Sequence, residues 1–127
     1  MEGLNLVTQN DPKNPAAEAY RVIRTSVQFA QAGKELQTIA LTSCTPNEGK
    51  STTIANLAVV LTQTGKSVLL IDCDMRNPTV HKNFNLSNKV GLSSCISMGT
   101  ALADAVQATA IEGLYALTAG VIPPNPS

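Results

Sequence analysis

A glycine, a lysine and a hydroxyl residue stand together where an apolar run gives way to a helical pattern. Gly49, Lys50 and Ser51 follow the strand-like run 38–42 and precede helically spaced apolar residues over 51–64. Backbone N–H groups in such a loop, with the positive end of the following helix, bind phosphate groups. A lysine in a first helical turn opposes the helix dipole unless an anion is present, which favours a phosphate site over an ordinary turn. The segment therefore predicts a nucleotide site.

The residues expected to contact the nucleotide surround this lysine. Lys50 can reach the β- and γ-phosphates, and the Ser51 hydroxyl can ligate Mg²⁺. The candidate binding residues are Pro46, Asn47, Glu48, Gly49, Lys50, Ser51 and Thr52. The general pattern G-x-x-x-x-G-K-[ST] has its first glycine at position 44, where this chain has Cys44. Asn47 partly compensates, since asparagine tolerates the left-handed backbone that such loops need.

Two carboxylates follow the second apolar run. The run 67–71 is typical of a buried parallel strand, and Asp72 and Asp74 come directly after it. In open α/β sheets, ligands bind at the carboxyl ends of the strands, where the phosphate loop also begins. The pair can hold Mg²⁺ beside a triphosphate, and one carboxylate can orient or deprotonate an attacking hydroxyl. The alternative is that Asp72 and Asp74 only cap the following turn and helix. Arg76 suits either a phosphate contact or a surface salt bridge.

The composition limits the classes of function. At 127 residues, 43% of them hydrophobic, the chain can form one domain with a core. Nine basic residues balance nine acidic ones, and Trp is absent, so nucleic acid is not an expected partner. Cys44, Cys73 and Cys95 have neither disulfide nor metal-ligand spacing, which indicates free thiols in a reducing cytosol. Because no apolar run reaches the ~20 residues of a membrane span, we expect a cytoplasmic chain whose membrane association comes through a partner.

The elements that must position these residues follow from local signals. Asn14 suits an N-cap and Pro15 a first helical position, so a helix is predicted over 15–32, ending at Gly33. Strands are predicted at 38–42, 67–71 and 114–118, and helices at 51–64, 92–97 and 102–108. This alternation of strands and helices predicts an α/β fold with a parallel sheet.

In combination, these motifs resemble the bacterial tyrosine kinases of capsular and exopolysaccharide synthesis. The matching segments are S-x-x-P-x-E-G-K-S-T at 43–52, L-L-I-D-C-D-M-R-x-P at 69–78, E-A-Y-R-V-I-R at 18–24, G-L-S at 91–93 and G-x-x-P-P-N-P-S at 120–127. The resemblance implies a P-loop NTPase fold, a parallel sheet with flanking helices, of which this chain would hold about half. It implies one portion of a kinase domain, with a flexible start at 1–14, an oligomerisation helix at 15–32 and a nucleotide-binding part at 38–127.

The resemblance also implies roles for particular residues. The catalytic residues would be Lys50, Asp72 and Asp74, and the metal ligands would be Ser51, Asp72 and Asp74, acting on ATP and Mg²⁺. Glu18, Arg21 and Arg24 would form the subunit interface of a ring-like homo-oligomer. Without the resemblance, the same helix suits a solvated face on which Glu18 and Arg21 form an i,i+3 pair. The implied activity is tyrosine autophosphorylation, and the implied partner is a membrane-spanning activator that controls polysaccharide chain length.

Two departures from the family pattern qualify these expectations. Asn47 stands where the family commonly has glycine. The family's third nucleotide motif, an apolar strand ending in Asp and followed by Thr-Pro-Pro, is not among the 127 residues, and Tyr20 and Tyr115 form no tyrosine cluster. Without that third strand, the run 38–42 should expose edge groups and apolar side chains. We therefore expect the isolated chain to be marginally stable, or to belong to an assembly or a longer chain.

Two other functions share these motifs. One is an ATPase switch of the ParA or MinD kind, although such proteins typically carry an extra lysine early in the phosphate loop, where this chain has Ser43, Cys44 and Thr45. The other is a module that binds nucleotide or oligomerises without catalysis.

Overall fold

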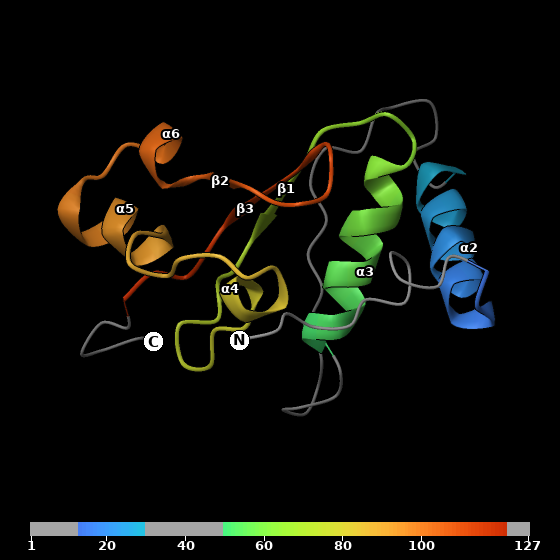
Figure 1. Ribbon diagram of the computed structural model, residues 1–127, viewed down its shortest axis with the longest axis horizontal. Helices are drawn as coiled ribbons and strands as arrows, with labels where there is room; N and C mark the ends of the chain where they lie inside the picture. The colour runs from blue at the N-terminus through green and yellow to red at the C-terminus, as the bar shows by residue number, and fades with distance from the viewer. Residues whose placement is uncertain (1–12, 30–49, 122–127) are drawn as a thin grey trace.

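The computed structural model describes residues 13–29 and 50–121. Its helices are α2 (Pro15–Phe29), α3 (Lys50–Thr62), α4 (Val80–Asn83), α5 (Leu92–Met98) and α6 (Leu102–Ala105), and its strands are β1 (Val68–Ile71), β2 (Gln107–Ala108) and β3 (Leu114–Leu117). Helix α3 lies between α2 and the strands (Figure 1). The predicted strand at 38–42 and the phosphate loop up to Gly49 lie outside the described residues.

The three strands form one sheet in the order β1-β3-β2. Strands β1 and β3 are parallel, with Val68 opposite Leu114 and Ile71 opposite Leu117, so the predicted parallel pairing is confirmed. Strand β2 was not predicted and runs antiparallel to β3. The helix predicted over 102–108 was too long, because the backbone turns extended at Val106, a β-branched residue that is a poor helix former. The two residues after it then pair with β3.

Helix α3 is buried on nearly every side. Residues 55–60 are all buried, including Asn56, whose Nδ2 donates to the Thr52 carbonyl at 2.9 Å. A helix that is apolar all round is covered all round, and here the sheet and α2 provide the cover. Ala55, Ala58 and Val59 of α3 share the core with Leu70, Val80, Leu114 and Ala116. The phosphate-loop helix is therefore the centre of the described core.

Two of the predicted helix ends agree with the local chemistry, whereas the end predicted at Gly33 lies outside the described residues. Asn14 Oδ1 accepts a hydrogen bond from the backbone N–H of Ala16 at 2.8 Å, so Asn14 caps α2 as expected. The chain leaves α3 at Gly65, whose φ of 85° is a backbone conformation that glycine adopts without strain. The amino end of α2 and the carboxyl end of α3 could be predicted from the sequence because each depends on residues within one turn of the helix.

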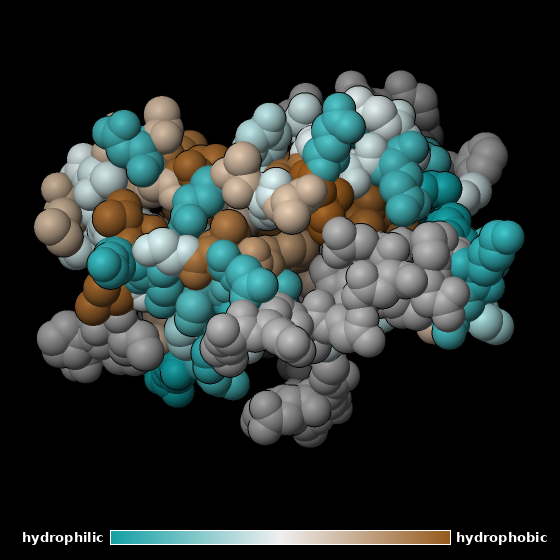
Figure 2. Space-filling view, in the orientation of Figure 1, coloured by the Kyte–Doolittle hydropathy of each residue, from teal (hydrophilic) through white to brown (hydrophobic). Residues whose placement is uncertain are grey.

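One face of the sheet carries exposed apolar side chains. Leu69, Ile71 and Tyr115 are 41%, 47% and 42% exposed, whereas Leu70 and Ala116 on the opposite face are buried. Leu69 and Tyr115 are directly opposite each other in the register. Parallel strands normally have both faces covered, so this open face is unusual. In Figure 2, apolar surface gathers over the strands and the α5–α6 end, whereas the α2 end is mostly hydrophilic. Among the described helices, none has the length and apolar character needed to cross a membrane.

Candidate functional site

The amino end of α3 and the carboxyl end of β1 lie at the same end of the domain. Helix α3 begins at Lys50, directly after the predicted phosphate loop, and its other end turns back through Gly65 into β1. Helix and strand therefore run in opposite directions, and the carboxyl end of β1 lies at the end where α3 begins (Figure 1). Ile54, in the first turns of α3, packs against the cluster that includes Val80 of α4. The positions of the Lys50 and Ser51 side chains, and of residues 46–49, are outside the described part of the chain.

Asp72 is a buried anchor for the segment that follows β1. Its side chain is 6% exposed, and its own N–H continues the sheet by donating to the Leu117 carbonyl at 3.0 Å. Asp72 Oδ1 accepts from the Asp74 N–H at 3.0 Å, while Oδ2 accepts from the N–H groups of Thr79 at 3.0 Å and Val80 at 3.1 Å. The last two groups belong to the start of α4. Asp72 thus caps both the turn and the helix, as the alternative interpretation of the motif held.

Asp74 has a different environment from Asp72. It is exposed, and its Oδ1 accepts from the backbone N–H groups of Arg76 at 3.2 Å and Asn77 at 3.0 Å. No residue of 13–29 or 50–121 donates a hydrogen bond to Asp74 Oδ2. A carboxylate has about four lone-pair sites, so Asp74 keeps a whole oxygen for a ligand, while Asp72 has about one site left. Arg76 is exposed as well. Of the two carboxylates, Asp74 is therefore the exposed one, with an oxygen that the described residues leave unbonded.

Within residues 13–29 and 50–121, no group of three or more His, Cys, Asp or Glu side chains is arranged to bind a metal ion. Cys73 and Cys95, the two cysteines in that region, are free thiols as expected. Mg²⁺ commonly binds through one or two carboxylates plus the phosphates of a nucleotide. The described donors fit that mode, in which the nucleotide supplies the remaining oxygens.

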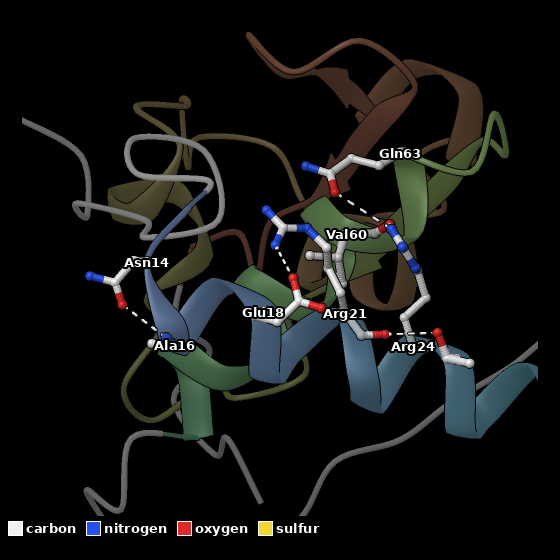
Figure 3. Close-up of polar contacts among 8 residues, drawn as sticks. Asn14, Ala16, Glu18, Arg21, Arg24, Val60 and Gln63 are labelled. Atoms are coloured by element: carbon white, nitrogen blue, oxygen red, sulfur yellow. Dashed lines mark hydrogen bonds and ion pairs between the residues drawn. The ribbon is translucent and has the colours of Figure 1, made fainter.

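The polar residues of α2 contact their own chain (Figure 3). Arg21 Nη1 pairs with Glu18 Oε2 at 2.8 Å, which is the i,i+3 pair anticipated for a solvated helix face. Arg24 Nη1 reaches α3, where it donates to the Val60 carbonyl at 2.8 Å. The structure thus brings Arg24 to the helix that begins at Lys50, although sequence reasoning had grouped it with Glu18 and Arg21.

A family model for the CobQ/CobB/MinD/ParA nucleotide binding domain matches residues 39–124, well over half of the chain. The chain belongs to this nucleotide-binding family. The match includes the predicted phosphate loop, α3 and the Asp72–Asp74 turn, and it confirms the P-loop NTPase fold class predicted from the sequence.

Bacterial tyrosine kinases are prominent among its relatives. The tyrosine-protein kinase YwqD of Bacillus subtilis (strain 168) is 49% identical over 123 residues, which are 97% of this chain and 52% of that protein. The chimerical protein CapA2B2 is 43% identical with a TM-score of 0.89, over 99% of this chain and 56% of that one. The kinase domain of Escherichia coli tyrosine kinase ETK is 33% identical with a TM-score of 0.91, over 99% of this chain and 49% of that one. The resemblance to bacterial tyrosine kinases is confirmed, and the chain spans about half the length of these relatives.

Two other matched segments of this nucleotide-binding domain meet in space. Gly91 opens α5, and its backbone lies against Gly120 after β3, where a Cβ on Gly91 would overlap the Thr118 carbonyl and the Gly120 backbone. Leu92 N–H donates to the Thr118 carbonyl at 2.7 Å, and Asn88 bonds both the N–H and the carbonyl of Gly120, at 2.8 and 2.9 Å. Sequence reasoning singled out both glycine segments without relating them. The signal available in the sequence was that each segment contains a glycine. In the structure, Gly91 has an extended backbone and Gly120 has a φ of 84°.

Replacing Gly91 with alanine is expected to destabilise the domain by about 3 kcal/mol, because the added methyl group meets backbone atoms that cannot rotate away. Gly99→Ala is the matched control, since Gly99 has open space around its Cβ position and a φ of 67°. Only the left-handed backbone opposes that change, at a cost of about 1 kcal/mol. Urea unfolding of the two variants measures the difference. Equal losses of stability would show that the Gly91–Gly120 contact is not tightly packed.

Proposed function

We propose that this chain is the nucleotide-binding half of a bacterial protein-tyrosine kinase domain and that it binds Mg²⁺-ATP. The observation that carries the proposal is the placement of the Asp72–Asp74 turn at the end of the domain where α3 begins with Lys50. A helix N-terminus attracts phosphate, and a nearby carboxylate attracts the accompanying metal ion. The identity with named tyrosine kinases along nearly the whole chain supports the same assignment.

Each candidate residue then has a defined task. The backbone of 46–49 and the first turn of α3 bind the phosphates, Lys50 neutralises their charge, and Ser51 and Asp74 hold Mg²⁺. Asp74 also orients or deprotonates the tyrosine hydroxyl, while Asp72 fixes the turn and contacts the metal through water. Phosphoryl transfer depends on such positioning and charge neutralisation rather than on covalent chemistry by the protein.

The wider setting follows from the kinase assignment. The substrate would be tyrosine residues of other copies of the same protein, and the pathway would be the synthesis and export of capsular or exopolysaccharide. The chain would work in the cytoplasm, bound to a membrane-spanning activator and assembled as a ring through α2. The similarity to the chimerical protein CapA2B2, and to the putative tyrosine-protein kinase CapB of Staphylococcus aureus, is consistent with a partner of this kind.

Nucleotide binding can be tested directly by titrating the chain with a fluorescent ATP analogue in the presence of Mg²⁺. Lys50→Met is expected to weaken binding by about 10-fold or more, because a charge-assisted contact to phosphate is lost. Lys89→Met, which removes an exposed lysine from the loop before α5, should bind as the wild type does. Equal affinities for the two variants would refute the proposed phosphate site.

A nucleotide-binding module without catalysis is the second candidate, because the matching family model describes a nucleotide binding domain. An ATPase switch is a third, because the family model includes MinD and ParA. Incubating γ-labelled ATP with a protein as long as the related kinases distinguishes the three candidate functions. A kinase transfers label to tyrosine, a switch releases inorganic phosphate only, and a module does neither.

A further inference from the structure

Helix α2 has one stripe that faces the protein and one that faces outward. The buried or half-buried positions recur every three or four residues, as on one helix face. They are Ala17, Tyr20, Arg21, Arg24, Val27 and Gln28. Val22 and Ile23, at 57% and 43% exposed, lie on the outward side with Glu18. Arg24 therefore belongs to the stripe that packs on α3.

Arg24 contacts the carboxyl end of α3 (Figure 3). Its Nη1 donates to the Val60 carbonyl at 2.8 Å and lies 3.5 Å from Gln63 Oε1. The last carbonyls of a helix lack partners within the helix and carry partial negative charge, so a cation there is favourable. Helix α3 has no basic residue in its own last turn. Arg24 supplies, from 36 residues away, the cation that α3 does not have.

The two ends of α3 are mechanically connected. The helix has 13 residues and is therefore about 20 Å long, with Lys50 at one end and the Arg24 contact near the other. Its sides pack against the sheet and α2, so α3 is held as one rigid element, and a contact near one end bears on the position of the other end. The orientation of its first-turn N–H groups determines how well they bind phosphate.

We propose that Arg24 is a positioning residue for the nucleotide: it clamps the carboxyl end of its own α3 and thereby holds the amino end in the phosphate-binding orientation. The proposal rests on the nucleotide site proposed above. It gives Arg24 a role within one chain, distinct from the contact between subunits that the family resemblance implies.

The test is the affinity of the full chain for a fluorescent Mg²⁺-ATP analogue, measured at several protein concentrations. Arg24→Ala is expected to weaken binding by about 10-fold, since the amino end of α3 is then held less firmly in the orientation that binds phosphate. Arg24→Lys should recover part of the affinity because it keeps a cationic donor. Thr25→Ala is the matched control, because Thr25 is exposed and its hydroxyl, within the described part of the chain, bonds only the Arg21 carbonyl of the same helix, at 3.0 Å. An effect within one chain should not change with protein concentration.

Particular results of this titration would overturn the proposal. Wild-type affinity in Arg24→Ala overturns it, and so does a loss that appears only on dilution, which would indicate an interface between subunits. If Arg24→Ala does not fold, Arg24→Gln and Arg24→Lys decide, and equal affinity of these two overturns it.

If the wild type binds no nucleotide, the proposed function fails, and hydrogen exchange still tests the clamp. Faster exchange of the α3 amides in Arg24→Ala, relative to Thr25→Ala, then supports the clamp, and unchanged exchange overturns it.

Discussion

Replacing Asp72 with alanine is expected to cost about 3–5 kcal/mol of folding free energy, because each buried donor left without a partner costs about 1–3 kcal/mol. Three backbone N–H groups, those of Asp74, Thr79 and Val80, donate to this one carboxylate. Helix α4 has no side-chain cap from Thr79, so the Asp72 carboxylate stands in for it. Because small domains are stable by only about 5–15 kcal/mol, this loss removes a large part of the stability of the chain. Urea unfolding followed by circular dichroism measures the loss.

Two further variants identify the cause of that loss. Asp72→Asn keeps an oxygen that can face Thr79 and Val80, so its expected cost is about 1–2 kcal/mol. Asp104→Ala removes an exposed carboxylate in α6 and should change stability by no more than about 0.5 kcal/mol. An Asp72→Ala midpoint equal to that of Asp104→Ala would mean that Asp72 does not anchor the turn.

Replacing Asp74 with asparagine is expected to remove activity and leave stability nearly unchanged. Asparagine Oδ1 can accept the same bonds from the Arg76 and Asn77 N–H groups, so the turn keeps its shape. The negative charge and the basic oxygen are lost, and a positioned base contributes about 10²–10⁴-fold to a rate. The rate of tyrosine phosphorylation, measured with a protein as long as the related kinases, should therefore fall about 100-fold or more.

The control for this second prediction is Asp104→Asn, which makes the same chemical change at an exposed position in α6. It should phosphorylate at the wild-type rate. If Asp74→Asn is as active as Asp104→Asn, then Asp74 is neither the base nor a metal ligand, and the catalytic assignment must move to another residue. A loss of activity accompanied by unfolding would instead mean that Asp74 has the same structural role as Asp72.

The two aspartates show how far sequence reasoning reached at the site. The motif at the end of β1 was read correctly as a strand end bearing two carboxylates, but nothing in the spacing distinguished one from the other. The structure separates them, since Asp72 is buried with three donors and Asp74 is exposed with an oxygen that no described residue bonds. That difference arises because α4 folds back onto the strand end, which places Thr79 and Val80 beside Asp72.

The sequence by itself determined the features that depend on neighbours in the chain. Propensities and hydrogen bonds within a few residues account for the Asn14 cap, the strands β1 and β3, the turn at Gly65, and a helix α3 that begins at Lys50, one residue before its predicted start. The resemblance to tyrosine kinases also came from short motifs, each contained in one segment.

Only the tertiary structure decided how those segments meet. Three of its results were not readable from local spacing: the Arg24 contact with Val60, the packing of Gly91 on Gly120, and the pairing of β2 with β3. Each joins segments that contact one another only once the chain has folded. Such packing depends on the shapes of whole faces, which no single stretch of residues contains.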